Sequence, residues 1–349
     1  MNTIASHLDS LAKPPGSLGQ LERLAGELCR IQGTLQPRST PRRMVLFAGD
    51  HGVVAERVTT WPSAITEIML QTIAAGKAAC NALAQSSATP LALFDVGSLE
   101  GGQRNENHPL INRSHWIRAG TRNLAVEAAL TRDEFRRAVE VGRLIASEAV
   151  IEGVEIFAGG EMGIGNTTPA ACLTALICGA KTDSVVGRGA GASDEILNRK
   201  RQVVDQAVSR VEPLFACDPE EALAAVSGLE IAAIAGFYAE ASKRGKVVVL
   251  DGFITTAAAL IAETLWPGSR KNFIAAHRSV EPGHAIALDH LGLTPFLEWN
   301  LRLGEGTGAL LLMPLLDAAA MMVTRMATLA DLQSLVPRQL DPHQDSHPG

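Results

Sequence analysis

The sequence predicts an α/β fold, in which a parallel sheet carries helices on both faces and a small helical domain is built from the two ends of the chain. Short apolar runs alternate with helical stretches from residue 44 onward, which is typical of consecutive strand–helix–strand units. The chain is helical before and after this region, so its two ends are expected to pack together. The expected strands are residues 44–48, 91–96, 154–158, 184–186, 247–250 and 273–276.

The same pattern divides the chain into segments. Residues 1–36 read as helices interrupted by residues 13–19, where two prolines and two glycines predict a rigid turn. This early turn is either a contact with a second subunit or a plain helix–helix turn. Residues 40–285 form the expected α/β nucleotide-binding domain, and residues 286–336 return to helices that complete the small domain and the active site. Residues 337–349, rich in Pro, His and Asp, are expected to be a disordered tail.

Composition and charge exclude several kinds of partner. A net charge of −6 and an aromatic content of only 4% argue against binding of nucleic acid. No pair of the five cysteines has zinc-finger or redox spacing, so reduced and buried thiols in a cytoplasm are expected. The longest apolar run, residues 309–323, is interrupted by Pro314 and Asp317, and the N-terminus lacks the pattern of a signal peptide. We therefore expect a cytoplasmic protein without a membrane or nucleic-acid partner.

The centre of the predicted site is the stretch FAGGEMGIGNTTP at residues 157–169. An apolar run leads into a loop with four glycines, and a helix is expected to begin with Thr168 as its cap and Pro169 in its first position. Glycines let backbone N–H groups approach a ligand closely, and the N-terminus of a helix adds partial positive charge. This combination favours an anion, most often phosphate.

The loop fits a monophosphate better than ATP or NAD. It lacks the Gly-Lys-Ser/Thr ending of a nucleoside-triphosphate loop, and Thr168 stands where a dinucleotide fingerprint has its third glycine. A tight strand-to-helix turn without a ligand is the alternative. Glu161 and Asn166 favour a ligand, because they are polar groups that such a turn does not need.

Glycines and polar residues also follow the other expected strands. Ligands of open α/β sheets bind beyond the carboxyl ends of the strands, so these residues predict one convergent site. Arg188 and Lys200 would add positive charge beside the glycine turn at residues 187–191, which is how a phosphate is commonly held. The alternative for Lys200 is a solvated helix face, because Arg199 and Arg201 adjoin it. The residues at the other strand ends are Asp50, His51, Gly187, Arg188, Gly189, Asp251, His277 and Ser279.

Glu305 is the strongest candidate for a catalytic group. Gly304, Gly306 and Gly308 surround it, so a substrate could approach its carboxylate over uncluttered backbone. A partly desolvated carboxylate has a raised pKa and can act as a general base near neutral pH. The alternative is an acid that begins the helix expected at residues 309–324 and is stabilised by the helix dipole.

Two other chemistries are not expected. Asp50 and His51 could be imagined in a triad with a distant serine, but the Gly-x-Ser-x-Gly elbow that would present such a serine does not occur in the sequence. His277, Glu281 and His284 have the wrong spacing for a metal site on one helix face, because a Pro-Gly pair interrupts them. We expect neither a metal nor a cofactor.

Taken in order along the chain, these motifs resemble the nicotinate-nucleotide–dimethylbenzimidazole phosphoribosyltransferase family, and the resemblance covers roughly residues 10–335. Each motif alone is weak, whereas the whole set in order is highly specific. The motifs are KPPGSLG (13–19), DHGV (50–53), GEMGIGNTT (160–168), GRG (187–189), DGF (251–253), HRSVE (277–281) and RLGEGTG (302–308).

The resemblance implies a Rossmann-like domain, a small helical domain and a homodimer. It also implies transfer of phosphoribose from nicotinate mononucleotide to 5,6-dimethylbenzimidazole, which gives α-ribazole 5'-phosphate and nicotinate. Glu305 would be the general base, with Glu161 as the second candidate, and the turns at residues 163–165 and 187–189 would hold the 5'-phosphate together with Lys200. The residues expected to bind substrate also include Gly163, Gly165, Asn166, Thr167, Gly187, Arg188, Gly189, Asp251, Ser279, Gly304, Asp50 and His51.

One departure from the family concerns the acceptor base. Well-known members have a serine before the proline at Pro62 and a glutamine eight residues after that serine, whereas this chain has Trp61 and Met69. Two polar groups near the benzimidazole become apolar, so a smaller or differently shaped ring is expected as acceptor. Alternatively, the two residues have merely drifted at the rim. The alternative functions are transfer to another lower-ligand base and non-catalytic binding of a nucleotide or azole.

Overall fold

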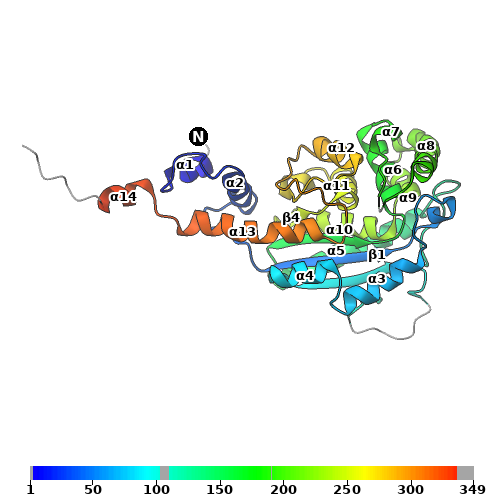
Figure 1. Ribbon diagram of the computed structural model, residues 1–349, viewed down its shortest axis with the longest axis horizontal. Coiled ribbons are helices and arrows are strands. Elements are labelled where there is room, and N and C mark those ends of the chain that lie inside the picture. The colour runs from blue at the N-terminus through cyan, green and yellow to red at the C-terminus, as the bar shows by residue number, and fades with distance from the viewer. Residues whose placement is uncertain (1–2, 103–109, 190, 336–349) are drawn as a thin grey trace, which may run out of the picture. The chain divides into compact units, whose positions relative to one another are not determined.

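The fold consists of a parallel sheet and the helices that surround it (Figure 1). The structure, a computed structural model, describes residues 3–102, 110–189 and 191–335, so the predicted tail at residues 337–349 lies outside the described residues. The strands are β1 (Arg42–Gly49), β2 (Leu91–Gly97), β3 (Ile156–Met162), β4 (Val247–Leu250) and β5 (Phe273–Ala275). The α-helices are α1 (Thr3–Ser10), α2 (Gln20–Gln32), α3 (Ala64–Ala74), α4 (Ala79–Ser86), α5 (Arg132–Ile151), α6 (Thr167–Cys178), α7 (Thr182–Val185), α8 (Asp194–Phe215), α9 (Pro219–Val226), α10 (Leu229–Lys243), α11 (Phe253–Leu265), α12 (Pro282–Leu291), α13 (Thr307–Arg325) and α14 (Leu329–Leu335). Short 3₁₀ helices are η1 (Gly52–Glu56) and η2 (Ser269–Asn272).

The strands follow the order β2-β1-β3-β4-β5, and each neighbouring pair is parallel. Phe47 of β1 lies opposite Phe94 of β2 on one side and Glu161 of β3 on the other. The chain places β2 on one side of β1 and the later strands on the other, so the strand order reverses between β1 and β3. In doubly wound sheets such a reversal opens the crevice in which ligands bind. The predicted Rossmann-like α/β class is confirmed.

Helices and loops cover both faces of the sheet, as the sequence predicted. On one face, the ring of Phe237 in α10 packs against Phe47 of β1 and Phe157 of β3, with centroid distances of 5.8 and 5.5 Å. On the opposite face, a Cβ at Gly160 of β3 would lie 3.0 Å from the backbone N of Gly306. The missing side chain at Gly160 therefore lets the loop before α13 lie directly on the strand.

Two predicted strands differ in the structure. Residues 184–186 do not form a strand: they fall at the end of the one-turn helix α7, where Val185 is buried. A run of three residues is too short to distinguish a strand from a buried helical turn. Strand β3 continues past residue 158 to Met162, so Glu161 lies on a strand and not in a loop. Glycine has a low strand propensity, and pairing with β1 overrides it here.

Helix α13 is continuous from Thr307 to Arg325, close to the helix expected at residues 309–324. Pro314 and Asp317, which interrupt its apolar run in the sequence, lie inside this helix. By length and composition alone this helix could cross a membrane, and 61% of its apolar window is buried inside the protein. Core helices of soluble proteins have a similar composition. The burial of most of this window inside the protein therefore explains the apolar side chains of α13.

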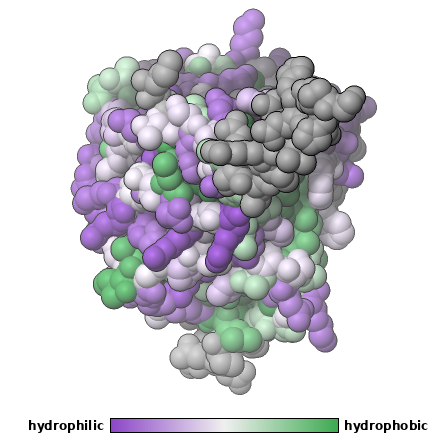
Figure 2. Space-filling model, turned by 90° about the vertical axis from the view of Figure 1, so that its left-hand side faces the viewer, coloured by the Kyte–Doolittle hydropathy of each residue, from purple (hydrophilic) through white to green (hydrophobic). Residues whose placement is uncertain are grey.

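The two ends of the chain form one compact unit, Met1–Arg38 with Leu315–Gly349, and Ser39–Pro314 forms the other. In the first unit an antiparallel bridge joins Leu11 to Thr328, so the N- and C-terminal segments contact each other directly. This unit corresponds to the small helical domain expected from the two ends of the chain, but its C-terminal part begins at Leu315 and not at residue 286. On the face of the molecule that Figure 2 shows, hydrophilic residues predominate and the hydrophobic ones form small, separate areas among them.

The turn at residues 13–19 is held by its own helix. The carboxylate of Glu22 in α2 accepts the N–H of Leu18 at 2.9 Å and that of Gly16 at 3.3 Å, and it pairs with Lys13 Nζ at 2.9 Å. These contacts form a closed helix–helix turn. A contact of this turn with a second subunit stays a prediction.

The five cysteines are all free of disulfides. Cys29, Cys80 and Cys172 are buried as expected, and Cys178 is partly buried. The expectation is wrong for Cys217, which is exposed because it lies in the short link between α8 and α9 at the protein surface.

Helix α5 packs on α10 through glycines, and this contact predicts a large loss of stability on substitution. A Cβ at Gly142 would lie 1.8 Å from the carbonyl O of Ala233, and one at Gly236 would lie 2.0 Å from the carbonyl O of Val139. We expect Gly142→Ala to lower the free energy of unfolding by about 3 kcal/mol or more, because backbone atoms cannot rotate away. Chemical denaturation measures the change.

Glu148→Ala is the matched control on α5, because Glu148 is exposed. It should change the free energy of unfolding by no more than about 0.5 kcal/mol. Equal stability of the Gly142→Ala variant and the wild type would show that α5 and α10 can separate at little cost.

Candidate active site

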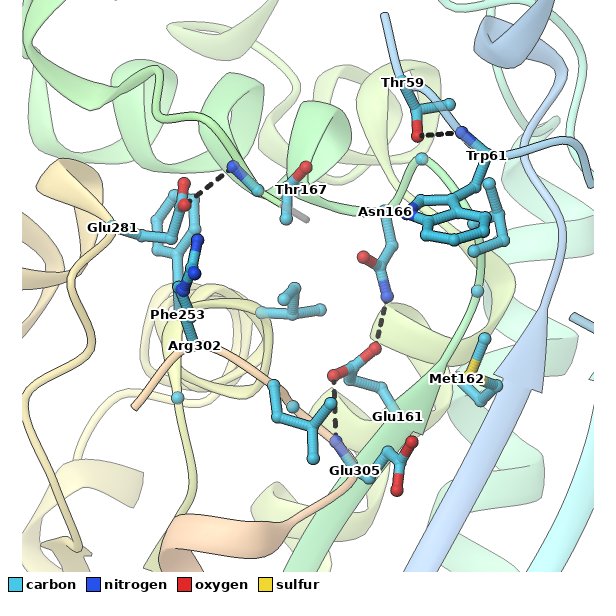
Figure 3. A pocket seen from close by; sticks show the side chains of 18 of the residues that line it. Thr59, Trp61, Glu161, Met162, Asn166, Thr167, Phe253, Glu281, Arg302 and Glu305 are labelled. Atoms are coloured by element: carbon cyan, nitrogen blue, oxygen red, sulfur yellow. Dashed lines mark hydrogen bonds between the residues drawn. The ribbon is translucent and has the colours of Figure 1, made fainter. Parts of the chain in front are cut away.

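A cavity of about 580 Å³ lies at the carboxyl ends of the strands (Figure 3). Its walls come from the segments that follow β1, β3, β4 and β5 and from the loop that precedes α13. All of the lining residues belong to the unit Ser39–Pro314. The cavity includes the end of β3, next to the point at which the strand order reverses.

Most of the predicted site residues line this cavity. Asp50, His51 and Gly187 do not. The predicted residues that line it are Trp61, Met69, Glu161, Gly163, Gly165, Asn166, Thr167, Arg188, Gly189, Lys200, Asp251, Ser279, Gly304 and Glu305.

Asp50 supports the glycine loop from behind. Its Oδ1 accepts the hydroxyl of Thr66 at 2.6 Å, and its Oδ2 accepts the N–H of Leu99 at 2.9 Å. The hydroxyl of Thr66 in turn accepts the N–H of Ile164 at 3.1 Å. Asp50 is therefore connected to the loop at residues 163–165 through Thr66, and it reaches the cavity only indirectly.

His51 forms a buried pair with Glu230 of α10. Its Nε2 lies 2.9 Å from Glu230 Oε1, and both side chains are inaccessible to solvent. Burial disfavours the charged imidazole, but the carboxylates of Glu230 and Asp50 outweigh this and raise the pKa of His51. The pair joins the end of β1 to α10, so the structure gives His51 a role in the scaffold.

The loop at residues 163–165 requires glycine for steric reasons. A Cβ at Gly163 would lie 2.2 Å from the carbonyl O of Gly49, and Gly165 has a φ of +92°. Helix α6 begins at Thr167, one residue before the predicted cap. Thr168 is fully buried and its Oγ1 has no hydrogen-bond partner, so the prediction that Thr168 caps the helix is wrong.

Glu161 lies at the end of β3 and is tied to both sides of the cavity. Asn166 stands at the cap position of α6 but donates its side-chain N–H to Glu161 Oε2 instead of capping the helix. The backbone N–H of Glu305 donates to Glu161 Oε1 at 3.4 Å, as Figure 3 shows. Glu161 therefore connects the glycine loop to the loop that carries Glu305.

Glu305 has an unusual backbone conformation. Its φ is +58°, and it lies between Gly304 and Gly306 with φ values of +89° and +72°. A residue with a side chain pays a conformational cost in this region, which surrounding contacts have to sustain. Asp251 supplies them: its Oδ2 accepts the N–H of Gly306 at 3.1 Å, and its Oδ1 accepts that of Gly308 at 2.6 Å.

The contacts of Asp251 bear on the two interpretations of Glu305. The N–H of Ala309 also donates to Asp251 Oδ1, at 3.1 Å, so the N-terminus of α13 binds the carboxylate of Asp251. These contacts weigh against the alternative in which Glu305 is the acid at the start of this helix that the helix dipole stabilises, and the catalytic role of Glu305 stays a prediction. Asp251 lines the cavity, but both of its carboxylate oxygens are used by backbone N–H groups.

The acids of the cavity have shifted pKa values. Burial, followed by the nearby charge of Asp251, raises the pKa of Glu161 to about 8, so Glu161 carries a proton at neutral pH. Burial also raises the pKa of Glu305, against the opposing effect of hydrogen bonds from Cys80 in α4. The affinity of the Glu305 carboxylate for a proton is thus raised above its ordinary value.

Lys200 lies at the other end of the cavity. It is only 1% exposed, so the interpretation of Lys200 as part of a solvated helix face is wrong. Its Nζ donates to the hydroxyl of Thr167 at 2.7 Å and to the carbonyl O of Gly187 at 3.2 Å. Burial lowers the pKa of Lys200 to about 8, with Glu281 acting in the opposite direction. Arg188 is half exposed and pairs with Asp194.

Trp61 and Met69 belong to an apolar part of the wall. Trp61 follows η1 and is 48% exposed at the rim, and Met69 lies on α3 and is half-buried. Ile65 and Ile68 of the same helix line the cavity beside them. One side of the cavity is therefore apolar and could accept a flat ring. Glu305 and Glu161 line the same cavity.

Sequence reasoning did not assign Glu281 to the site, although the structure does. Its Oε1 accepts the N–H of Gly189 at 2.8 Å. The signal was available, because Glu281 ends the HRSVE stretch (277–281) in the segment between β5 and α12. Ser279 is held near Glu281, because the N–H of Ser279 donates at 2.9 Å to Nδ1 of His284. Burial lowers the pKa of His284 to about 3.

Across residues 3–102, 110–189 and 191–335, no group of three or more His, Cys, Asp or Glu side chains is placed to hold a metal ion.

The pKa of Glu161 predicts a pH dependence of stability. In the unfolded chain Glu161 ionises near its ordinary value of 4.5, whereas the folded protein holds the proton up to about pH 8. Between these values the folded state binds more protons, so the stability of the wild type falls as pH rises. We expect Glu161→Gln to gain stability relative to the wild type by at most about 1.4 kcal/mol per pH unit in this window.

Denaturation of both proteins from pH 5 to pH 8 measures this gain. Glu148→Gln on the surface of α5 is the control and should leave the pH profile unchanged. Parallel profiles of Glu161→Gln and the wild type would mean that Glu161 is ionised in the folded protein throughout.

Comparison with known proteins places the chain in a family. Residues 1–333 match the phosphoribosyltransferase family. The chain is 45% identical, over 92% of its length and 94% of the relative's, to the nicotinate-nucleotide–dimethylbenzimidazole phosphoribosyltransferase of Thermus thermophilus, and 44% identical to that of Salinispora tropica, over 94% and 93%. The crystal structure of CobT from Thermus thermophilus superposes with a TM-score of 0.90 at 43% identity, over 95% of this chain and 97% of that chain. The chain therefore belongs to the nicotinate-nucleotide–dimethylbenzimidazole phosphoribosyltransferase family of enzymes.

Proposed function

We propose that this enzyme transfers phosphoribose from nicotinate mononucleotide to a benzimidazole-type base, giving α-ribazole 5'-phosphate or its analogue and nicotinate, in the assembly of the nucleotide loop of cobalamin. The observation that carries the proposal is the pair of groups in one cavity: a buried carboxylate, Glu305, with a raised pKa, and a buried lysine, Lys200 of α8, which donates to Thr167 at the start of α6. A base and an anion-binding group in one cavity suit a substrate that reacts at one end and is held at the other.

The reaction needs one proton acceptor. The nicotinate nitrogen of the donor is a positively charged pyridinium, so the electron pair of the breaking bond to C1' neutralises it and no general acid is required. The azole nitrogen forms the new bond to C1' from the opposite face, which inverts the anomer. The azole N–H proton passes to the carboxylate of Glu305, whose raised pKa suits it to this step.

The phosphate supplies orientation. We assign it to a phosphate cradle, defined as Thr167, Gly189 and Lys200, next to the glycine loop before α6. Lys200 gives a charge-assisted hydrogen bond, and the N-terminus of α6 adds its dipole. Fixing the donor at a distance from C1' makes the attack effectively unimolecular. The neutral acid of Glu161 would lie near the ribose and the base as a hydrogen-bonding group.

The apolar wall favours a modified choice of acceptor. Trp61 and Met69 offer area and a stacking surface but no amide or hydroxyl to bond the azole. A non-catalytic binder would not need Glu305 in a costly backbone conformation, which weighs against that alternative. We further propose that the enzyme works as a homodimer in the cytoplasm.

The direct test is incubation of the purified protein with nicotinate mononucleotide and a panel of bases. The panel contains 5,6-dimethylbenzimidazole, benzimidazole, adenine and a phenol, and mass spectrometry identifies the products. Release of nicotinate together with a base-specific ribotide supports the proposal. Absence of any ribotide with every base would contradict it.

The role proposed for Glu305 predicts a large loss of rate. We expect Glu305→Gln to lower kcat by roughly 10²–10⁴-fold, the usual contribution of a positioned general base, because the amide cannot take the azole proton. Donor affinity should be unchanged, as measured by calorimetry with nicotinate mononucleotide. A kcat close to that of the wild type would assign the base elsewhere, with Glu161 as the next candidate.

The apolar wall predicts an altered preference among bases. Stacking on Trp61 is worth about 0.5–1.5 kcal/mol beyond buried area and does not depend on hydrogen bonding. Discrimination by polar contacts should therefore be weak, so benzimidazole or another compact ring should rival 5,6-dimethylbenzimidazole.

The double variant Trp61→Ser with Met69→Gln should shift the preference back towards 5,6-dimethylbenzimidazole. Competition assays with paired bases on both proteins give the product ratio. Ile68→Ala, at a neighbouring position of α3, is the control for a general loss of apolar surface. Identical ratios in the wild type and the double variant would show that Trp61 and Met69 do not select the acceptor.

A further inference from the structure

Glu281 occupies part of the phosphate cradle. Its Oε1 accepts the N–H of Gly189 at 2.8 Å, and its Oε2 is buried without a hydrogen-bond partner in a residue that is only 7% exposed. The same oxygen lies against the glycine turn, because a Cβ at Gly187 would be 2.1 Å from it. A carboxylate therefore binds a backbone donor that suits a phosphate oxygen (Figure 3).

The local structure of α12 does not account for this placement. Glu281 is the N-cap residue of α12, yet its side chain makes no capping hydrogen bond. The carboxylate instead reaches a turn that lies 92 positions earlier in the chain. A buried oxygen without a hydrogen-bond partner is destabilising, so the contact of Glu281 with this turn leaves one polar atom unsatisfied.

The charges around Glu281 make it a competitor of phosphate. Lys200 is the buried cation of the cradle, and the carboxylate of Glu281 raises the pKa of this lysine against the effect of burial. An incoming phosphate would use the same cation and the same N–H of Gly189. Two anions in a buried site repel each other, so phosphate and the ionised Glu281 cannot both be bound there without a cost.

We propose that Glu281 is a specificity-determining residue that takes the place of the donor phosphate in the ligand-free state and so limits the affinity of the cradle for phosphate. Donor binding displaces the carboxylate from Gly189. When the product dissociates, the carboxylate of Glu281 replaces its phosphate and bonds again to the N–H of Gly189. The inference rests on the proposed function in one respect, the assignment of the donor phosphate to this cradle.

The test is calorimetric titration of inorganic phosphate into the full-length enzyme and its variants. Glu281→Gln keeps the shape of the side chain and an acceptor for Gly189 but loses the charge. We expect it to bind phosphate roughly tenfold more tightly than the wild type, the effect of removing one like charge from a partly screened site. Equal or weaker binding of phosphate by Glu281→Gln would overturn the proposal.

Asp289→Asn is the matched control, because Asp289 lies on the same helix but is exposed and does not line the cavity. It should bind phosphate as the wild type does, and a gain equal to that of Glu281→Gln would overturn the proposal in favour of a general charge effect. Glu281→Asp provides a second variant if Glu281→Gln does not fold. Its shorter side chain withdraws the carboxylate from Gly189, so its phosphate affinity should lie between those of the wild type and Glu281→Gln, and an affinity at or below that of the wild type would overturn the proposal.

Kinetics provide a further readout that a merely structural role would not move. In Glu281→Gln the KM for nicotinate mononucleotide should fall, and the KM for the acceptor base should not change. The titration needs no turnover, so its outcome is separable from the proposed function. Failure of the wild type to release nicotinate contradicts the function alone, whereas unchanged phosphate affinity in Glu281→Gln contradicts the role of Glu281 alone.

Discussion

The carboxylate of Asp251 at the N-terminus of α13 is the interaction on which the site depends. It accepts the N–H groups of Gly306, Gly308 and Ala309 and so ties the start of the helix to the end of β4. The first N–H groups of a helix have no intrahelical partner and attract an anion. Because Asp251 satisfies them, Glu305 is not drawn to its own helix terminus. Its costly backbone conformation is sustained by bonds that other residues make.

The cavity contains carboxylates with different tasks, and their surroundings separate them. Asp251 is saturated by backbone N–H groups, and Glu161 is buried next to it and holds a proton at neutral pH. Glu305 has a raised pKa and an oxygen, Oε2, without a hydrogen-bond partner, so it is left to take up a proton. Glu281 faces the cation at the other end. The same functional group thus has different surroundings at each of these positions, set by its burial and its neighbours. The roles of Glu305 as the base and of Glu281 as the competitor of phosphate are proposals.

The fold was predictable from the sequence because its signals are local. Apolar runs between helical stretches indicated the parallel sheet, and the helical ends indicated the small domain. The errors also have local causes. Glycines 159 and 160 read as a loop, but pairing with β1 extends β3 through them, and the short run at residues 184–186 read as a strand although it ends a helical turn. In both cases tertiary contacts outweigh a weak local preference.

The sequence by itself determined the family, the glycine turns and the acids at the strand ends, since each is written in a short contiguous motif. Only the tertiary structure decided which of these side chains reach the cavity. Asp50 and His51 follow β1 yet bond to Thr66 and Glu230, outside the cavity lining, whereas Glu281 lines the cavity and bonds to a turn far away in the chain. The physical reason is that a strand end determines where a residue lies, while the direction of its side chain depends on partners brought there by packing.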